Sequence, residues 1–269
     1  MGINDFIPKP VEAAELHLRA GSLLRLKQAH DQIRRHKTEL EQAVEKRTLD
    51  LRAAMNGVVA AQRQTHEAHL DTIRRLVLAA EYKDRDTGTH IERMGRYSEV
   101  LAKGCQLAPR AIEVIRNASP MHDVGKLGIP DAILLKSGQL DPDEWEVMKQ
   151  HTIIGVKILH GSQSPVLQAG EIIALSHHER WDGSGYPNGI AGREIPVQAR
   201  ICAVADVFDT LTSNRHYRDA LPNQTVCEMI ESQKERHFDP NIVNVFFESL
   251  EEIEAIQREY GEDKSASLA

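Results

Sequence analysis

The sequence predicts an all-α fold in which a long N-terminal helix precedes a helical bundle, and three observations favour this class. Aromatic residues make up only 4% of the chain, and few segments alternate polar with apolar residues as strands do. Residues 11 to about 80 contain no proline and only two glycines, as a long helix requires. Beyond them, prolines stand mainly where apolar-periodic segments begin.

The composition is typical of a globular protein with one or two domains. Its 269 residues are 41% hydrophobic and 27% charged, which is long enough for a sizeable core. The net charge of -7 gives no support for a surface that binds a nucleic-acid polymer or a membrane. No apolar run approaches the ~18 residues of a membrane span, and no signal-peptide region begins the chain. Cys105, Cys202 and Cys227 show no paired spacing, so we expect reduced thiols and a cytoplasmic location.

The first residues form a short extended segment, Gly2 to Pro10, followed by a helix that starts near Val11. This segment resembles the last strand, the Lys-Pro loop and the final helix of the receiver domain in two-component response regulators. In that comparison Lys9 matches the lysine that contacts the phosphorylated aspartate. The resemblance covers residues 1–26 and implies a truncated receiver remnant that lacks the phosphoacceptor aspartate. The alternative is an ordinary polar N-terminal extension.

Residues 11–80 carry a heptad pattern that predicts a coiled coil. From Leu23 to Ala68 the a and d positions are mostly apolar, with interruptions at His30, Lys37 and Arg47. At ~1.5 Å per residue such a helix is on the order of 100 Å long and has no core of its own. We therefore expect a parallel homodimer, the alternative being a helix that folds back on its own domain. After residue 65 the apolar phase shifts, which predicts entry into a globular domain, to Leu70, Ile73, Val77 and Ala80.

Residues 70–260 alternate apolar-periodic segments with prolines and glycines, and we expect them to form the globular domain, with a flexible tail at residues 261–269. One helix is expected to start at Pro109 and to end with His122 and Asp123. Asp141, Pro142 and Glu144 have the pattern of a capping box ahead of another helix, which we expect to run to Leu159 with His151 near its middle. Three more helices are expected after Pro196, Pro222 and Pro240.

Eight residues of the types that bind metals fall at helix ends or on apolar helices of this domain. Asp206 interrupts a strongly apolar helix, where an ionised carboxylate is costly unless it is paired or metal-bound. Asp123 can place its two oxygens between metals, while the neighbouring His122 can bind only one. Each residue alone is more often a satisfied polar group, but together they exceed what a helical core carries by chance. They are Asp86, His90, His122, Asp123, His151, His177, His178 and Asp206.

Two motifs in this domain resemble those of a known family. His122-Asp123 lies within His-Asp-Val-Gly-Lys-Leu-Gly-Ile-Pro, and Gly185-Tyr186-Pro187 closes the loop that follows the pair His177-His178. From about Leu70 to Val245 the chain resembles the HD-GYP family, a subgroup of the HD-domain metal phosphohydrolases. Known members hydrolyse the bacterial second messenger cyclic di-GMP. The resemblance therefore implies an HD-type helical bundle and a cyclic di-GMP phosphodiesterase that acts in signal transduction.

The resemblance also implies a ligand set for two or three divalent metals, usually iron or manganese. One metal would be held by His90, His122, Asp123 and Asp206. The other would be held by His151, His177 and His178, with Asp123 as the bridge. Family members with a third metal carry a glutamate four residues before the first histidine. This chain has the shorter Asp86 there, so the third metal stays open.

The charge of a cyclic dinucleotide explains why metals are needed. Two cations ~3.5–4 Å apart can bind a phosphoryl oxygen and lower the pKa of a bridging water, and the resulting hydroxide attacks phosphorus to give pGpG, GMP or both. Mixed histidine and carboxylate ligands suit iron, manganese or zinc better than magnesium. Asp123 and Lys126 are the expected catalytic residues, with Lys126 also neutralising the phosphate. Tyr186, Arg215 and Arg218 are expected to bind substrate, although the arginines can also be a plain helix-terminal cluster.

Two alternatives belong to other classes of function. The chain can be an HD phosphohydrolase that acts on a related cyclic dinucleotide such as cyclic GMP-AMP. It can also be an inactive regulator that binds partners through the coiled coil or the Gly-Tyr-Pro face. The complete set of metal-type residues favours the enzyme, and a panel of substrates would separate the close analogues.

Overall fold

The computed structural model describes residues 10, 12–84, 88–214 and 219–261 of the chain. These residues divide into two compact units, Met1–Ala68 and His69–Ala269, which we describe separately. The segments that resemble a receiver domain around Lys9 lie outside the described residues.

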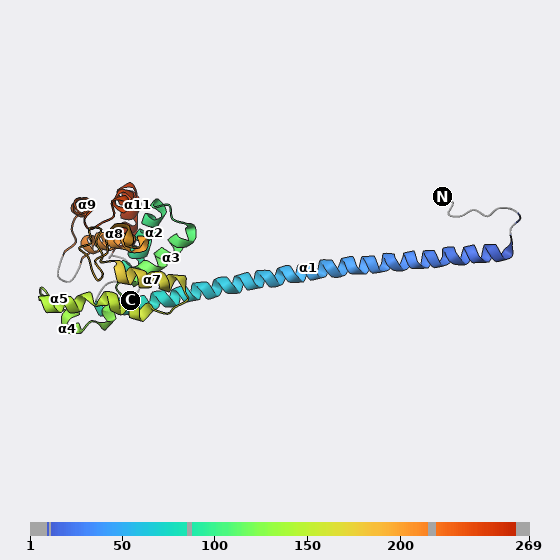
Figure 1. Cartoon of the computed structure of the whole chain (residues 1–269), viewed down its shortest axis with the longest axis horizontal. Helices are drawn as coiled ribbons and strands as arrows, with labels where there is room; N and C mark the ends of the chain where they lie inside the picture. The colour runs from blue at the N-terminus through green and yellow to red at the C-terminus, as the bar shows by residue number, and fades with distance from the viewer. Residues whose placement is uncertain (1–9, 11, 85–87, 215–218, 262–269) are drawn as a thin grey trace. The chain divides into compact units, whose positions relative to one another are not determined.

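The first unit consists of one helix in its described part. Helix α1 (Ala13–Asp84) runs through this unit without a break and continues into the second (Figure 1). Its heptad positions are open to solvent: Leu26 is 69% exposed, Ile33 67% and Leu40 66%. Such large apolar side chains are normally covered, so this face fits the expected coiled-coil partner, and the dimer stays a prediction.

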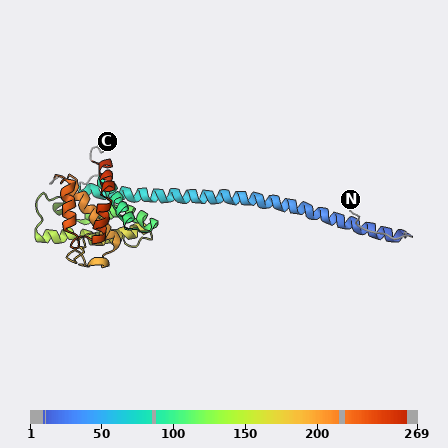
Figure 2. The same ribbon diagram turned by 90° about the horizontal axis from the view of Figure 1, so that it is seen from above.

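The second unit is a bundle of helices (Figures 1 and 2), which confirms the prediction of an all-α fold. Its described residues form no strand, and their only bridge joins Lys234 to Phe238. The helices after α1 are α2 (Gly88–Gly104), α3 (Pro109–Ala118), η1 (Ser119–Met121), η2 (Val124–Gly128), α4 (Asp131–Leu134), α5 (Pro142–Lys149), α6 (His151–Leu159), α7 (Pro165–Ser176), η3 (Gly192–Glu194), α8 (Val197–Thr212), α9 (Asn223–Ser232), α10 (Pro240–Glu248) and α11 (Leu250–Glu259).

Helices α2 and α8 form the centre of the core. Three aromatic rings connect α2, α8 and α10: the centroids of Tyr97 and Phe208 are 5.6 Å apart, and those of Phe208 and Phe246 are 5.3 Å apart. The last turns of α1 join the same core through Ile73, Val77 and Ala80. The shift in apolar phase after residue 65 therefore marks where the chain begins to bury side chains.

Two predicted helices end earlier than expected. Helix α3 ends at Ala118, and His122 and Asp123 lie between the two 3₁₀ turns η1 and η2. Pro120 explains this, because proline has no N–H to continue the helical ladder. The helix after the capping box is also two helices, so His151 begins α6 and is not in the middle of a helix. The capping box itself, formed by Asp141 and Glu144, is present as predicted.

No described helix is both long enough and apolar enough to cross a membrane.

Candidate metal centre

Four of the predicted metal-type residues converge at the ends of three helical segments. One ligand atom from each of four side chains lies within 4.8 Å of the others, and these are Asp123, His151, His177 and His178. Asp123 precedes η2, His151 begins α6, and His177 follows α7. Residues at such ends can aim side chains across the axis of their helix, so three helical segments can share one point.

Three further residues form a second group, again within 4.8 Å of one another: His90, His122 and Asp206. His90 comes from the first turns of α2, and Asp206 from the middle of α8. Both helices belong to the core, which explains how a carboxylate on an apolar helix reaches two histidines.

Asp123 connects the two groups. Its Oδ2 lies 3.3 Å from Nε2 of His122, while its Oδ1 lies 3.4 Å from Nε2 of His151 and 3.6 Å from Nε2 of His177. On the other side, Nε2 of His122 is 3.6 Å from Oδ1 of Asp206. Oδ2 thus faces His122, while Oδ1 faces His151 and His177, so one carboxylate contacts both groups.

Hydrogen bonds behind the cluster orient the imidazole rings. The Nδ1 atoms of His122, His151 and His177 contact the backbone carbonyls of Ser119, Met148 and Ile173 at 2.8–3.0 Å. A carbonyl oxygen only accepts, so each of these Nδ1 atoms must carry the proton. In the neutral form of each ring, Nε2 then keeps its lone pair toward the cluster, which is the tautomer that binds metal.

His90 is oriented by a charged pair. Its Nδ1 donates to Oδ2 of Asp209 at 2.7 Å, and Arg93 donates to both oxygens of Asp209, from Nε at 2.5 Å and from Nη2 at 2.9 Å. All three side chains are buried. A carboxylate behind a ligating histidine fixes its ring and raises its basicity.

The electrostatics favour ionised carboxylates in the centre. Burial raises the pKa of Asp123, but Lys126 and His122 outweigh it and hold that pKa well below its usual value. For Asp206 burial also raises the pKa, and the contact with His122 brings it below its usual value. The two carboxylates that act on His122 are therefore negative and able to attract a cation.

Burial keeps two of the histidines neutral. Burial lowers the pKa of His151 to about 4, and burial also lowers the pKa of His178 well below its usual value. His122 behaves in the opposite way: burial lowers its pKa, but Asp123 and Asp206 raise it well above the usual value. A proton on His122 and a cation would compete for the same carboxylates.

The residues present fit a divalent metal site. Nε2 of His122 and Oδ1 of Asp123 are buried and have no hydrogen-bond partner, although buried polar atoms are nearly always paired. Both atoms point into the cluster, and imidazole nitrogen with carboxylate oxygen is a donor set for divalent transition metals. A cation in each group would satisfy these two atoms.

Glycines allow the chain to approach closely at two points of the centre. A Cβ on Gly125 would lie 1.8 Å from the carbonyl oxygen of His151. A Cβ on Gly185 would lie 2.3 Å from the backbone nitrogen of Arg180. Only glycine fits either place, so these residues bring η2 against α6 and return the Gly-Tyr-Pro loop to the paired histidines.

The other predicted site residues divide into two sets. Lys126 reaches the centre, with Nζ 2.7 Å from Oδ2 of Asp123. Tyr186 stacks on the ring of His178, with centroids 4.7 Å apart and planes at 28°. Asp86, Arg215 and Arg218 lie outside the described residues.

Three residues near the centre were not predicted. Asp209 follows Asp206 by one helical turn on the same apolar helix, where an ionised carboxylate again needs a partner. Arg93 is that partner. Glu81 is only 3% exposed, its Oε2 has no hydrogen-bond partner, and its charged neighbours include His90 and Asp123. Burial raises the pKa of Glu81. The sequence signal for Glu81 was a carboxylate directly after the apolar positions of α1 that are buried in the core.

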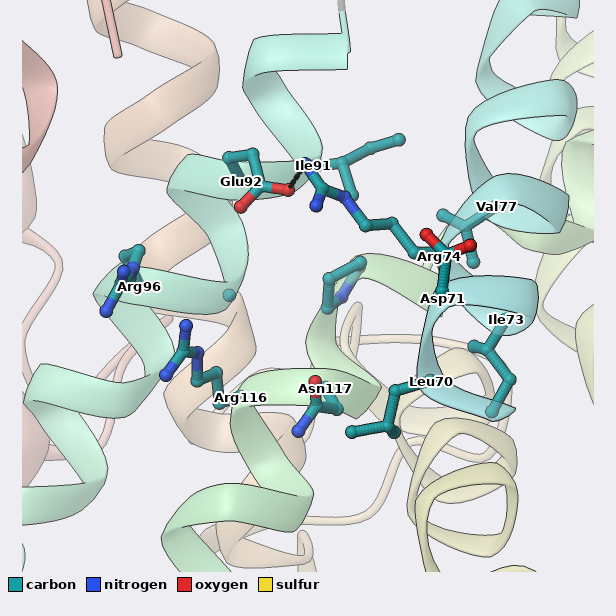
Figure 3. Close-up of a pocket in the computed structure, with 12 residues that line it drawn as sticks. Leu70, Asp71, Ile73, Arg74, Val77, Ile91, Glu92, Arg96, Arg116 and Asn117 are labelled. Carbon is teal, nitrogen blue, oxygen red and sulfur yellow. Dashed lines mark ion pairs between the residues drawn. The ribbon is translucent and has the colours of Figure 1, made fainter. Parts of the chain in front are cut away.

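A pocket of about 250 Å³ lies elsewhere in the second unit (Figure 3). Residues of α1, α2 and α3 line it, and an ion pair between Arg74 and Glu92 closes one side. Arg96 and Arg116 also line it, and both pair with Glu99. None of the lining residues belongs to the two metal-type groups, so this pocket is separate from the centre.

Comparison with known proteins shows the family of the chain. The model of the HD domain family matches residues 61–242. The cyclic di-GMP phosphodiesterase response regulator RpfG of Xanthomonas campestris pv. campestris is 40% identical over 95% of this chain and 64% of its own length. A cyclic di-GMP phosphodiesterase of Thermotoga maritima is 39% identical over 98% of this chain and 70% of its own. The chain therefore spans about two thirds of the length of these relatives.

Two matches concern a different cyclic dinucleotide. The 3'3'-cGAMP-specific phosphodiesterase 2 of Vibrio cholerae is 44% identical over 71% of this chain and 37% of its own length. The crystal structure of a cyclic GMP-AMP specific phosphodiesterase from V. cholerae, V-cGAP3, superimposes with a TM-score of 0.55, covering 74% of this chain and 52% of that one. At 17% sequence identity this last match supports the fold alone.

Proposed function

Because this chain belongs to the HD domain family, we propose that it is a metal-dependent phosphodiesterase that hydrolyses cyclic di-GMP to pGpG, GMP or both. The observation that carries the proposal is the position of Asp123, whose Oδ2 lies beside Nε2 of His122 and whose Oδ1 lies beside those of His151 and His177. Relatives named as cyclic di-GMP phosphodiesterases match 95% and 98% of the chain, which supports the choice of substrate.

The chain's own residues divide the work of the reaction. His90, His122 and Asp206 would hold one cation, His151, His177 and His178 the other, and Asp123 both. When bound, two such cations supply a water of lowered pKa and draw charge from the phosphodiester. We infer that iron or manganese fills these positions, since mixed imidazole and carboxylate donors suit both.

Lys126 and Tyr186 complete the proposed site. The Lys126 ammonium lies beside Asp123 and can pair with a phosphate oxygen as negative charge grows in the transition state. The Tyr186 ring, packed on His178, presents an aromatic group next to the histidines. We infer that Arg215 and Arg218 bind phosphate and that Asp86 decides whether a third metal is held.

The direct test is turnover by protein purified without oxygen and reloaded with Fe²⁺ or Mn²⁺. Cyclic di-GMP should be converted to pGpG or GMP, and metal analysis should give at least two ions per chain. Asp123→Ala should lose both the ions and the activity, because each group of nitrogens loses its shared carboxylate. Equal turnover by Asp123→Ala and the unchanged protein would rule out the assigned site.

A second substrate is supported by one particular relative. The V. cholerae enzyme that is specific for 3'3'-cGAMP shares 44% identity with this chain. Both dinucleotides present the same phosphodiesters to the metals and differ in one base, so the centre alone does not separate them. Values of kcat/KM for cyclic di-GMP and 3'3'-cGAMP under the same metal loading decide between the two.

We also infer that residues 1–26 derive from a receiver domain. The Lys9-Pro10 pair and the following helix support this, and one relative that matches most of the chain is a response regulator. Without the phosphoacceptor in residues 1–26, the segment would serve as the start of α1.

A further inference from the structure

Helix α5 carries an exposed tryptophan that neither the fold nor the metal centre explains. Trp145 is 46% exposed, and none of the residues of α5 is buried. The helix is held at its first turn by the capping box of Asp141 and Glu144, and by the ion pair of Lys136 with Glu144. The indole is therefore not needed to anchor α5, although large aromatic rings are normally used to bury area.

A row of rings joins this tryptophan to the metal centre. The Trp145 ring meets Tyr186 at 6.1 Å between centroids, with the planes at 79°. Tyr186 in turn stacks on His178 and meets the edge of His151, with the centroids 6.4 Å apart. Two rings, those of Tyr186 and Trp145, thus lead outward from the metal-type histidines, and the Trp145 ring is partly exposed to solvent.

A cation borders the same surface. Nζ of Lys149 lies 5.8 Å from the centre of the Tyr186 ring and 2.7 Å from a carboxylate oxygen of Glu146. Lys149 follows Trp145 by one helical turn on α5, so both project toward Tyr186. An aromatic face beside an ammonium group is the combination that binds a flat, electron-rich ring with acceptor atoms on its edge.

From this arrangement we infer that Trp145 forms a nucleobase-binding subsite, on which one purine of the cyclic dinucleotide stacks while its phosphate lies at the metal centre. The inference rests on the proposed function for the identity of the ligand. Lys149 faces the edge of the stacked base, where guanine offers the acceptors O6 and N7. A protein partner docked on α5 is the other possible occupant, and continuity with the Tyr186 and His178 rings favours the base.

The chain has two tryptophans, Trp145 and Trp181, which allows binding to be measured without turnover. Trp181→Phe leaves Trp145 as the sole indole, and Trp145→Phe leaves Trp181, whose ring faces the Arg200 guanidinium at 5.9 Å. Each metal-loaded variant is titrated with the bis-phosphorothioate analogue of cyclic di-GMP, which resists hydrolysis. We expect saturable quenching of the tryptophan fluorescence in the Trp181→Phe protein and none in the Trp145→Phe protein. The absence of quenching in the Trp181→Phe protein would overturn the subsite.

Kinetics separate a stacking role from a structural one. Trp145→Ala should raise KM by about tenfold, within the range that stacking of one base contributes, and change kcat by less than about twofold. Trp145→Phe should restore most of the loss. Val147→Ala is the matched control, because Val147 is also exposed on α5, at 37%. An equal effect of Val147→Ala, or an unchanged KM in Trp145→Ala, would contradict the inference.

The two proposals fail in different ways. Quenching of Trp145 without hydrolysis would leave the subsite and remove the phosphodiesterase activity. Hydrolysis with a KM that is insensitive to Trp145 would leave the activity and remove the subsite.

Discussion

The side chain of Asp123 shows how one residue can determine a centre. Its Oδ2 faces His122, its Oδ1 faces His151, and Lys126 holds its pKa low. The sequence predicted this residue type at this place because a His-Asp pair followed by glycines is distinctive. It did not predict Asp209 or Arg93, which act behind His90, because a buried ion pair has no spacing rule and depends on which helices become neighbours.

Substitution of Asp209 tests whether the residues behind His90 orient its ring. In Asp209→Ala, His90 loses the acceptor of its Nδ1–H, and Arg93 is left buried with a charge that Asp209 had neutralised. We expect the affinity for Mn²⁺ to fall by about 10–100-fold, with some loss of stability. Isothermal titration with Mn²⁺ measures the affinity. Unchanged affinity in a folded variant would mean that the Asp209 contact does not orient His90.

His237, which belongs to neither metal-type group, gives the protein a further pH dependence. Burial lowers its pKa to about 4 in the fold, opposed by Asp182 and Asp206 and reinforced by Arg180. The unfolded chain therefore binds more protons than the folded one between pH about 6.5 and about 4, so stability falls as pH falls through this window. The free energies of unfolding of the wild-type protein and of His237→Gln, measured with urea, should converge toward low pH. A pH-independent difference would contradict this origin.

At the scale of helices, starts were easier to predict than ends. The capping box and the prolines at first turns gave α3, α5 and α10 their beginnings, because these signals act within one turn. The break after Ala118 comes from Pro120, whereas the break at Gln150 depends on tertiary contacts. At the second break Gly125 packs directly on the His151 carbonyl, a contact between segments that periodicity does not contain.

Helix α1 yields a prediction about association. Leu40 occupies a d position and is 66% exposed, while Leu49 lies outside the a and d positions and is 59% exposed. If the a and d positions of α1 pack against a second copy of the chain, Leu40→Asp should weaken the dimer of the full chain by at least about tenfold. Leu49→Asp is the matched control and should leave it unchanged. Sedimentation equilibrium decides, and a monomeric unchanged protein at micromolar concentration would exclude the coiled-coil dimer.

At the scale of the second unit, the centre draws on segments from most of its sequence. His90 comes from α2, His122 and Asp123 from the turns after α3, His151 from α6, His177 from the end of α7, and Asp206 from α8. These elements also form the core through α2, α7 and α8. The sequence order of these histidines and aspartates was predictable, but their convergence is a property of the packed bundle.

Metal binding should therefore stabilise this unit as a whole. Ions that bind only the folded centre raise stability with concentration, by about 2.7 kcal/mol at a hundred times Kd. We expect chelation to lower Tm and added Mn²⁺ to restore it, as followed by calorimetry. In Asp123→Ala the Tm should no longer respond to Mn²⁺. A response equal to that of the unchanged protein would place the stabilising ions elsewhere.

The glycines differ in whether a side chain can be added, and this difference shows where a label can be attached. A side chain at Gly125 would collide with the His151 carbonyl, whereas a Cβ on Gly138 meets no atom within 4 Å. Gly138→Cys is thus a suitable attachment point for a dye or a spin label, placed in the exposed loop between α4 and α5.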